Sequence, residues 1–474
     1  MTVPVPTPPG FAELPLMLAD VPQVVARLLR DVGLPTRDCD EPVPPGGATG
    51  RFVLIDSRHR GATRRLRQAA TESHEVLDVR DLAGRCDDLE EPNPGTRHGR
   101  RWAPAARRFV ERLKQALESR GGVWARLTDF PYPDRGVVCL AVEHPSAKSA
   151  PETWAEVSHG VDSFGLLTTH LLAPAQSPSG FDRFPSDRFS HDRAVHDRAF
   201  HNADSPAEFG WRITREDCAS TSRKTVAAWR EALSRWSRQG RVPHCLLVAD
   251  SPASRRGVPS PSPQALLDLG LHVRLQRDEW GPWVGAGLAG EPVLPWVDLG
   301  LAPLPSVGDA SRWVGDLYRA GQPVLVLAES GGPELAAELR AFDQACQSWP
   351  LLRRTSLAAW GHWWTARRGV EFAVWRTATG PVVQAPHPLP PGDWGWELWR
   401  GNHFAALPLT SAVQSIPENG LPLAFAGDRH PGGLSVPRTG AEIGPVPPRP
   451  RWRGLKAWLH SLTLFRDQAK GVVP

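Results

Sequence analysis

Apolar and polar positions along the chain form two alternating patterns, short continuous apolar runs and stretches with one apolar face. The apolar runs lie at residues 52–56, 74–79, 137–142, 164–172, 245–248 and 324–327. Amphipathic stretches lie at residues 61–73, 104–120, 152–160, 217–238, 263–269, 309–320 and 333–349. Buried parallel strands read as continuous apolar runs, and helices connect them. The order therefore predicts an α/β fold with a parallel sheet or barrel covered by helices.

The two ends of the chain differ from this central region in composition and in the pattern of apolar residues. Residues 1–50 read as a proline-rich lead-in, and residues 51–120 as an N-terminal βαβ segment. The parallel sheet or barrel is expected over residues 121–368, with a low-complexity loop at 178–207. Short tryptophan-rich strands punctuated by Gly and Pro predict a β-rich module at 369–450. A C-terminal amphipathic helix is expected at 451–474.

Composition narrows the class of protein. A chain of 474 residues is too long for one ordinary core, and predicts about three units. Lys+Arg 55 against Asp+Glu 51 leaves a net charge of only +4, so nucleic acid is not an expected partner. No window approaches 18 consecutive apolar residues, and the cysteines form no C-x-x-C pair. We expect a cytoplasmic protein with free thiols and no integral membrane segment, and the oligomeric state stays open.

One segment resembles a known family. Residues 121–133 (GGVWARLTDFPYP), followed by VVCLAVEHPSA, resemble the opening of the NodB-homology polysaccharide deacetylases, carbohydrate esterase family four. The later order of SFGLLTTHLL, QPVLVLAES, SLAAWGHWWTARR and WELWRGNHFAALPL is also similar to that family. The resemblance implies a deformed (β/α) barrel of the NodB/glycoside hydrolase-deacetylase type, with a polysaccharide or other glycan as partner.

Removing an N-acetyl group requires a metal-held water, a carboxylate base and an acid that protonates the leaving amine. The resemblance implies an Asp-x-Asp at the end of the first strand, but this chain has Glu143 and then Pro145, which cannot bind a metal. Glu143 remains a candidate base. Asp298, in a Pro-Trp-Val-Asp segment at an expected strand end, and Glu329, near the late-strand acid position, are the other candidate catalytic carboxylates.

The implied metal-binding histidines fall in an unusual segment. His191 and His196 are separated by four residues instead of three, and both lie where Asp-Arg recurs with a period of five. Such a repeat is typical of a surface loop, although a flexible loop can also bind metal through its histidines. Trp296 and Arg255 are candidate substrate-binding residues, although the Arg-x-Pro-aromatic order of the family is absent near Arg255.

These substitutions favour a catalytically inactive protein that binds a glycan or acts in assembly, with no cofactor. The alternative is an active metal-dependent deacetylase that uses Glu143 with His191, His196 and a zinc-like divalent ion. A second alternative is a structural partner of another protein. Five tryptophans at helix-like spacing are expected in the core instead of in a glycan site: Trp211, Trp229, Trp236, Trp360 and Trp363.

Overall fold

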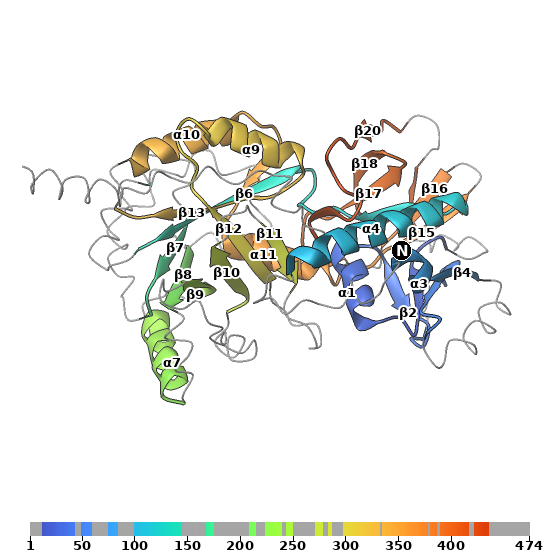
Figure 1. Cartoon of the computed structure of the whole chain (residues 1–474), viewed down its shortest axis with the longest axis horizontal. Coiled ribbons are helices and arrows are strands. Elements are labelled where there is room, and N and C mark those ends of the chain that lie inside the picture. The colour runs from blue at the N-terminus through green and yellow to red at the C-terminus, as the bar shows by residue number, and fades with distance from the viewer. Residues whose placement is uncertain are drawn as a thin grey trace, which may run out of the picture.

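The computed structural model describes residues 12–42, 49–58, 74–83, 99–144, 157, 167–174, 208–214, 223–238, 243–249, 271–277, 283–286, 297–331, 334–377, 380–385, 389–416 and 421–435. In this part of the chain, a parallel barrel lies beside a parallel N-terminal sheet and two antiparallel sheets (Figure 1). Helix α4 (Gly99–Ser119) runs across the N-terminal sheet, and the barrel lies beyond one end of this helix (Figure 1).

Seven parallel strands close the barrel. They follow the order β6 (Gly136–Glu143), β7 (Thr169–Leu172), β8 (Glu208–Thr214), β9 (Pro243–Ala249), β10 (Val273–Arg277), β12 (Val297–Pro303) and β13 (Val324–Glu329). The ring closes because β13 pairs with β6 and β10 pairs with β12. An antiparallel strand, β11 (Trp283–Ala286), lies along β12, and β14 (Leu352–Arg354) pairs with the start of β6. The predicted deformed (β/α) barrel is therefore confirmed.

Alternation along the strands separates the inside of the barrel from the outside. In β6, Val137, Cys139 and Ala141 belong to a core that also contains inward residues of the opposite strands. The intervening Val138 and Leu140 pack outward in a second core with helices α9 (Ala310–Arg319) and α10 (Leu335–Gln347). Because side chains of a strand point alternately to its two faces, the apolar run of β6 serves both cores.

Helix α11 (Leu357–Arg367) closes the end of the barrel where the strands begin. A Cβ placed on Gly361 of this helix would lie 2.5 Å from Cγ2 of Val273 and 3.1 Å from Cγ1 of Val297, the first residues of β10 and β12. Trp360 is 1% exposed and Trp363 is 2% exposed. The helix is therefore a packed floor, and the opposite end, where the strands finish, is the mouth of the barrel.

The N-terminal sheet contains four parallel strands in the order β2 (Thr36–Asp38), β1 (Leu16–Ala19), β3 (Phe52–Ile55) and β4 (Glu75–Asp78). Helix α1 (Gln23–Val32) connects β1 to β2, and α3 (Val79–Ala83) follows β4. The βαβ segment expected at 51–120 is thus joined by β1, α1 and β2, which fall in the part read as a lead-in. The apolar run of β1 is only four residues long and follows several prolines.

Two antiparallel sheets come mainly from the C-terminal part. One has the order β15 (Ala373–Thr377), β16 (Gly380–Gln384) and β19 (Gln414–Ser415). The other has the order β20 (Ala424–Phe425), β18 (His403–Pro408), β17 (Gly395–Arg400) and β5 (Trp124–Leu127), and the 3₁₀ helix η4 (Gly433–Ser435) follows. Strand β5, from the segment assigned to the barrel, pairs with β17. The additional β sheets expected at the C-terminus are present.

Amphipathic periodicity located four of the described helices but missed α1 and α3. Predicted helices at 104–120, 217–238, 309–320 and 333–349 correspond to α4, α7 (Arg223–Arg238), α9 and α10. The five tryptophans expected in the core are all at most 6% exposed. The helices predicted at 61–73, 263–269 and 451–474, and the loop at 178–207, lie outside the described residues, as does 152–160 apart from residue 157.

Candidate functional site

Four charged side chains enter the barrel near the carboxyl ends of its strands. Glu143 and Glu329 are the last residues of β6 and β13 and are register partners. Arg277 ends β10, and Arg212 lies near the end of β8. In each strand, the charged residue lies two positions after a residue that points into the barrel, and in β8 that residue is Gly210. Because every second side chain of a strand points to the same face, all four charged side chains also point into the barrel. The mouth of the barrel is therefore lined by two carboxylates and two guanidinium groups.

Glu143 is the centre of this charged group. Its Oε1 accepts a hydrogen bond from Nε of Arg212, and its Oε2 accepts one from Nη2 of Arg277. The side chain of Glu143 is only 4% exposed, against 26% for Arg212 and 40% for Arg277. Arg277 also donates from Nη1 to Oε1 of Glu329 at 2.8 Å. Strands β6, β8, β10 and β13 are thus linked through one chain of ion pairs.

The charges of this group balance. Burial disfavours the charge of Arg277, but Glu143 and Glu329 outweigh it and raise the pKa of the guanidinium above its ordinary value. Arg277 therefore stays protonated throughout the physiological range. Both Glu143 oxygens face permanent cations, and a guanidinium can neither accept a proton nor bind a metal. These contacts oppose the use of Glu143 as a base or a metal ligand.

Two histidines lie beside the mouth but on the outer side of the barrel. His144 follows inward Glu143, and His170 lies between inward Thr169 and Leu171. Their rings stack with centroids 5.2 Å apart, and Nε2 of His144 lies 2.9 Å from Nδ1 of His170. Burial lowers the pKa of His144 to about 4 and the pKa of His170 well below its ordinary value. The pair is neutral near pH 7 and adds no charge to the mouth.

A third polar group lies at the floor of the barrel. Glu208, the first residue of β8, accepts hydrogen bonds at Oε1 from Oγ1 of Thr169, at 2.5 Å, and from the amide of Ala358, at 3.0 Å. Ala358 lies in the first turn of α11, where unsatisfied amide groups favour a carboxylate. Ser356, the N-cap, also accepts from the amide of Ala359. Glu208 therefore helps to fix the start of the helix that closes the barrel.

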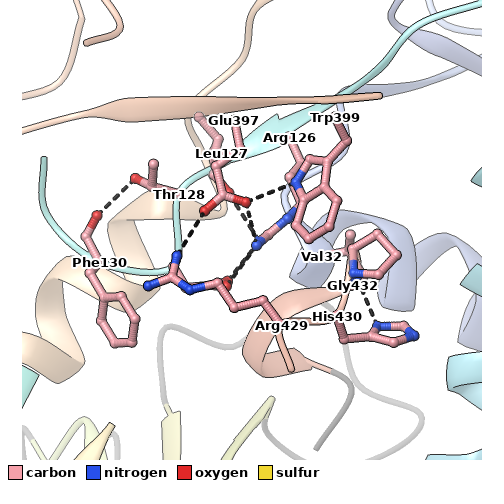
Figure 2. A network of polar contacts seen from close by, with 12 residues as sticks. Val32, Arg126, Leu127, Thr128, Phe130, Glu397, Trp399, Arg429, His430 and Gly432 are labelled. Carbon is pink, nitrogen blue, oxygen red and sulfur yellow. Dashed lines mark hydrogen bonds and ion pairs between the residues drawn. The ribbon is translucent and has the colours of Figure 1, made fainter. Parts of the chain in front are cut away.

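A buried network lies where β5 meets the C-terminal sheet (Figure 2). Arg126 donates from Nη1 and Nη2 to the two carboxylate oxygens of Asp129, each at 2.8 Å. Its Nη2 also lies 2.6 Å from Oε2 of Glu397, which accepts from Nε1 of Trp399 at 3.0 Å. Arg429 approaches the same carboxylate from the other side, at 4.0 Å. All these contacts join protein groups to each other, which is typical of a structural junction.

A cavity of about 360 Å³ lies beside this junction, between α4 and the loop that follows β20. Its charged lining is engaged in pairs: Lys114 contacts Glu118 at 2.7 Å, and Nε2 of His430 lies 3.0 Å from Oε1 of Glu111. Nδ1 of His430 accepts a hydrogen bond from the amide of Gly432 at 2.9 Å, so Nε2 carries the proton. The lining is mixed in charge, and we place the candidate site at the barrel mouth instead.

The structure brings only part of the predicted site together. Glu143 and Glu329 meet at the mouth through Arg277. Asp298 is the second residue of β12 and pairs in register with Arg274, near the start of the strand. It therefore lies toward the floor, although the sequence had placed it at a strand end, because β12 continues through residue 303. The other predicted positions lie outside the described residues: Trp296, Arg255, His191 and His196.

Arg212 and Arg277 were missed by the sequence analysis. The available signal was an arginine at the inward position near the end of a short strand, as in EFGWRIT and VRLQR. Among the described residues, no group of three His, Cys, Asp or Glu side chains is arranged to hold a metal ion. The described mouth residues do not fit a divalent cation, because two guanidinium groups face the carboxylate that would bind it.

Comparisons with known proteins add little to this geometry. No protein-family model and no curated protein matches the chain. One solved structure, described as "putative polysaccharide deacetylase from Mycobacterium smegmatis", is similar with a TM-score of 0.34 and 11% sequence identity. The match covers 51% of this chain and 94% of that one. Similarity at this level supports no conclusion about the site. None of the helices in the described ranges is long and apolar enough to span a membrane.

Proposed function

We propose that this chain is a carbohydrate-binding protein built on a deacetylase-like barrel, and that it binds its glycan at the barrel mouth without hydrolysing it. One observation carries the proposal. Both carboxylate oxygens of Glu143, the candidate base, are engaged by the inward-facing Arg212 and Arg277. The same two arginines supply the recognition chemistry of the mouth, since planar guanidinium groups bind carboxylates and polar ligands through several donors.

The position of the charged group also supports ligand binding. In parallel (β/α) barrels, ligands bind at the end where the strands finish, because the loops there vary without disturbing the packed barrel. Glu143, Arg277 and Glu329 are each the last residue of a strand at that end. The floor, by contrast, is filled by α11 and its tryptophans. The mouth therefore offers polar side chains on rigid elements.

Hydrolysis of an N-acetyl group needs a base with a free lone pair close to an activated water. At the mouth, a water or metal that approached Glu143 would have to displace an arginine from a carboxylate that is 4% exposed. Leaving such a carboxylate unpaired is strongly unfavourable. Under this proposal, the protein needs no metal cofactor, and Glu143 is a positioning residue that orients Arg212 and Arg277.

Acetate release tests this proposal. The purified full chain is incubated with N-acetylated chitooligosaccharides, with and without added zinc, and acetate is measured alongside metal content. We expect acetate release equal to that of the protein-free control, and oligosaccharide binding detectable by calorimetry. Zinc-dependent release that the Glu143→Gln variant loses, while its circular dichroism stays unchanged, would establish an active deacetylase and overturn the proposal.

A further inference from the structure

We infer that Glu329 occupies the binding position of a ligand carboxylate, so that the glycan taken at the mouth is acidic and displaces Glu329 from Arg277. The inference rests on the proposed binding function and adds the chemical class of the ligand. It starts from an asymmetry between the two carboxylates that contact Arg277. The side chain of Glu143 is 4% exposed, whereas the side chain of Glu329 is 62% exposed.

The contacts show which carboxylate can leave. Glu143 is held by two guanidinium groups from two different strands. Within the described part of the chain, Glu329 makes one side-chain contact, of 2.8 Å with Nη1 of Arg277, and its strand ends there. Exposed ion pairs of this kind contribute little to stability, because water solvates both charges when they separate. Turning Glu329 into solvent therefore costs little free energy, and Nη1 of Arg277 then becomes available to a ligand.

Charge balance indicates how many negative charges the ligand brings. With Glu329 turned away, Arg212 and Arg277 face Glu143 alone, which leaves one positive charge at the mouth. A single carboxylate restores the balance that Glu329 maintains without ligand. A phosphate dianion would place a second negative charge near Glu143, where repulsion is weakly screened. The geometry thus favours a monoanionic group, as carried by each uronic acid of an acidic polysaccharide.

The guanidinium of Arg277 is already oriented for this exchange. Its Nη2 is fixed on the buried Glu143, and its Nη1 points to the more exposed side, toward Glu329. A donor held in place before binding loses less entropy when the ligand arrives. Arg277 therefore is the specificity-determining residue, and Glu329 is an internal competitor for it.

Calorimetric titration of the full chain with trigalacturonate, and with its uncharged methyl ester, tests the inference. We expect the acid to bind at least about tenfold more tightly than the ester, since hydrogen bonds to charged groups discriminate strongly. Glu329→Gln removes the competitor and should tighten binding of the acid about twofold to fivefold, the range for exposed ion pairs. Glu371→Gln makes the same charge change at an exposed position before β15 and should leave the affinity unchanged.

The outcomes separate this inference from the proposed function. Equal affinity for acid and ester would overturn the acidic-ligand assignment while leaving glycan binding intact. Unchanged or weaker binding of the acid by Glu329→Gln would overturn the competitor role. If inorganic phosphate displaces bound trigalacturonate more strongly than acetate does, the carboxylate assignment is overturned. Binding of neither galacturonate form by a wild type that does bind the N-acetylated chitooligosaccharides would overturn this inference alone, whereas a wild type that binds none of these oligosaccharides would overturn the proposed function itself. Arg277→Gln should weaken binding of the acid about tenfold. If Arg277→Gln folds poorly, the result for Glu329→Gln still tests the inference.

Discussion

Replacing Arg367 by methionine tests whether one buried guanidinium ties the N-terminal sheet to the rest of the fold. Arg367 lies at the end of α11, and its side chain is 1% exposed. Its donors reach backbone carbonyls of two separate segments and one carboxylate: Thr128 at 2.6 Å, Asp31 at 2.7 Å, Val32 and Leu127 at 3.0 Å, and Asp129 Oδ1 at 3.4 Å. The side chain thus joins the end of α1 to the end of β5.

The magnitude follows from these partners. Burial lowers the pKa of Arg367 to about 10, which still leaves the group protonated at pH 7. Methionine preserves most of the packing against Trp364, whose ring lies 4.7 Å from the guanidinium carbon, but supplies no donor. Removing one partner from a buried charged network costs about 3–5 kcal/mol. Since Arg126 repels Arg367, and that repulsion is also removed, we expect the free energy of unfolding to fall by about 3 kcal/mol.

Urea unfolding followed by circular dichroism measures this loss. Arg340→Met is the matched control, because Arg340 is exposed on α10 and its Nε donates at 3.2 Å to the carbonyl of Ala336 in the same helix. It should change the free energy of unfolding by less than about 0.5 kcal/mol. Arg367→Lys keeps the charge with fewer donors and should fall between wild type and Arg367→Met. A loss of less than about 1 kcal/mol in Arg367→Met would refute the assigned role.

Two further results are expected. Gly210→Ala should destabilise the barrel by about 1–3 kcal/mol in thermal or urea unfolding, because the new Cβ would lie 2.3 Å from Sγ of Cys245; Gly308→Ala, with open space around it, should not. The free energy of unfolding should fall as pH drops from about 6.5 to 4, and His144 alone should account for about 3 kcal/mol of this fall. The reason is that the pKa of His144 is about 4 in the folded protein, below its ordinary value of 6.5, so that only the unfolded chain takes up a proton in this range. A profile equally steep in His144→Gln would contradict this assignment.

The sequence predicted the elements whose physical signal is local. Continuous apolar runs located β6 and β13, since both faces of these strands are buried. The periodicity of α4 and α10 likewise reflects one buried helix face. Closure of the barrel through the β10–β12 pair, and pairing of β5 with β17, depend on contacts between distant segments, which no local pattern reveals.

The site itself explains why part of the barrel was missed. Strands β8 and β10 carry Arg212 and Arg277 at inward positions, and these charges interrupt the apolar pattern by which a buried strand is recognised. Their partner Glu143 was identified, because it directly follows a strong apolar run. The residues that obscured the strands are thus the ones that give the mouth its chemistry, and their convergence on Glu143 appears only when the barrel closes.

A crystal structure of the full chain grown with trigalacturonate and zinc together would test the central claim most directly. The account predicts a ligand carboxylate within hydrogen-bond distance of Arg277, Glu329 turned away from it, and Glu143 still held between Arg212 and Arg277. Zinc bound to Glu143, with the two arginines displaced from that carboxylate, would contradict the account and support a metal-dependent hydrolase.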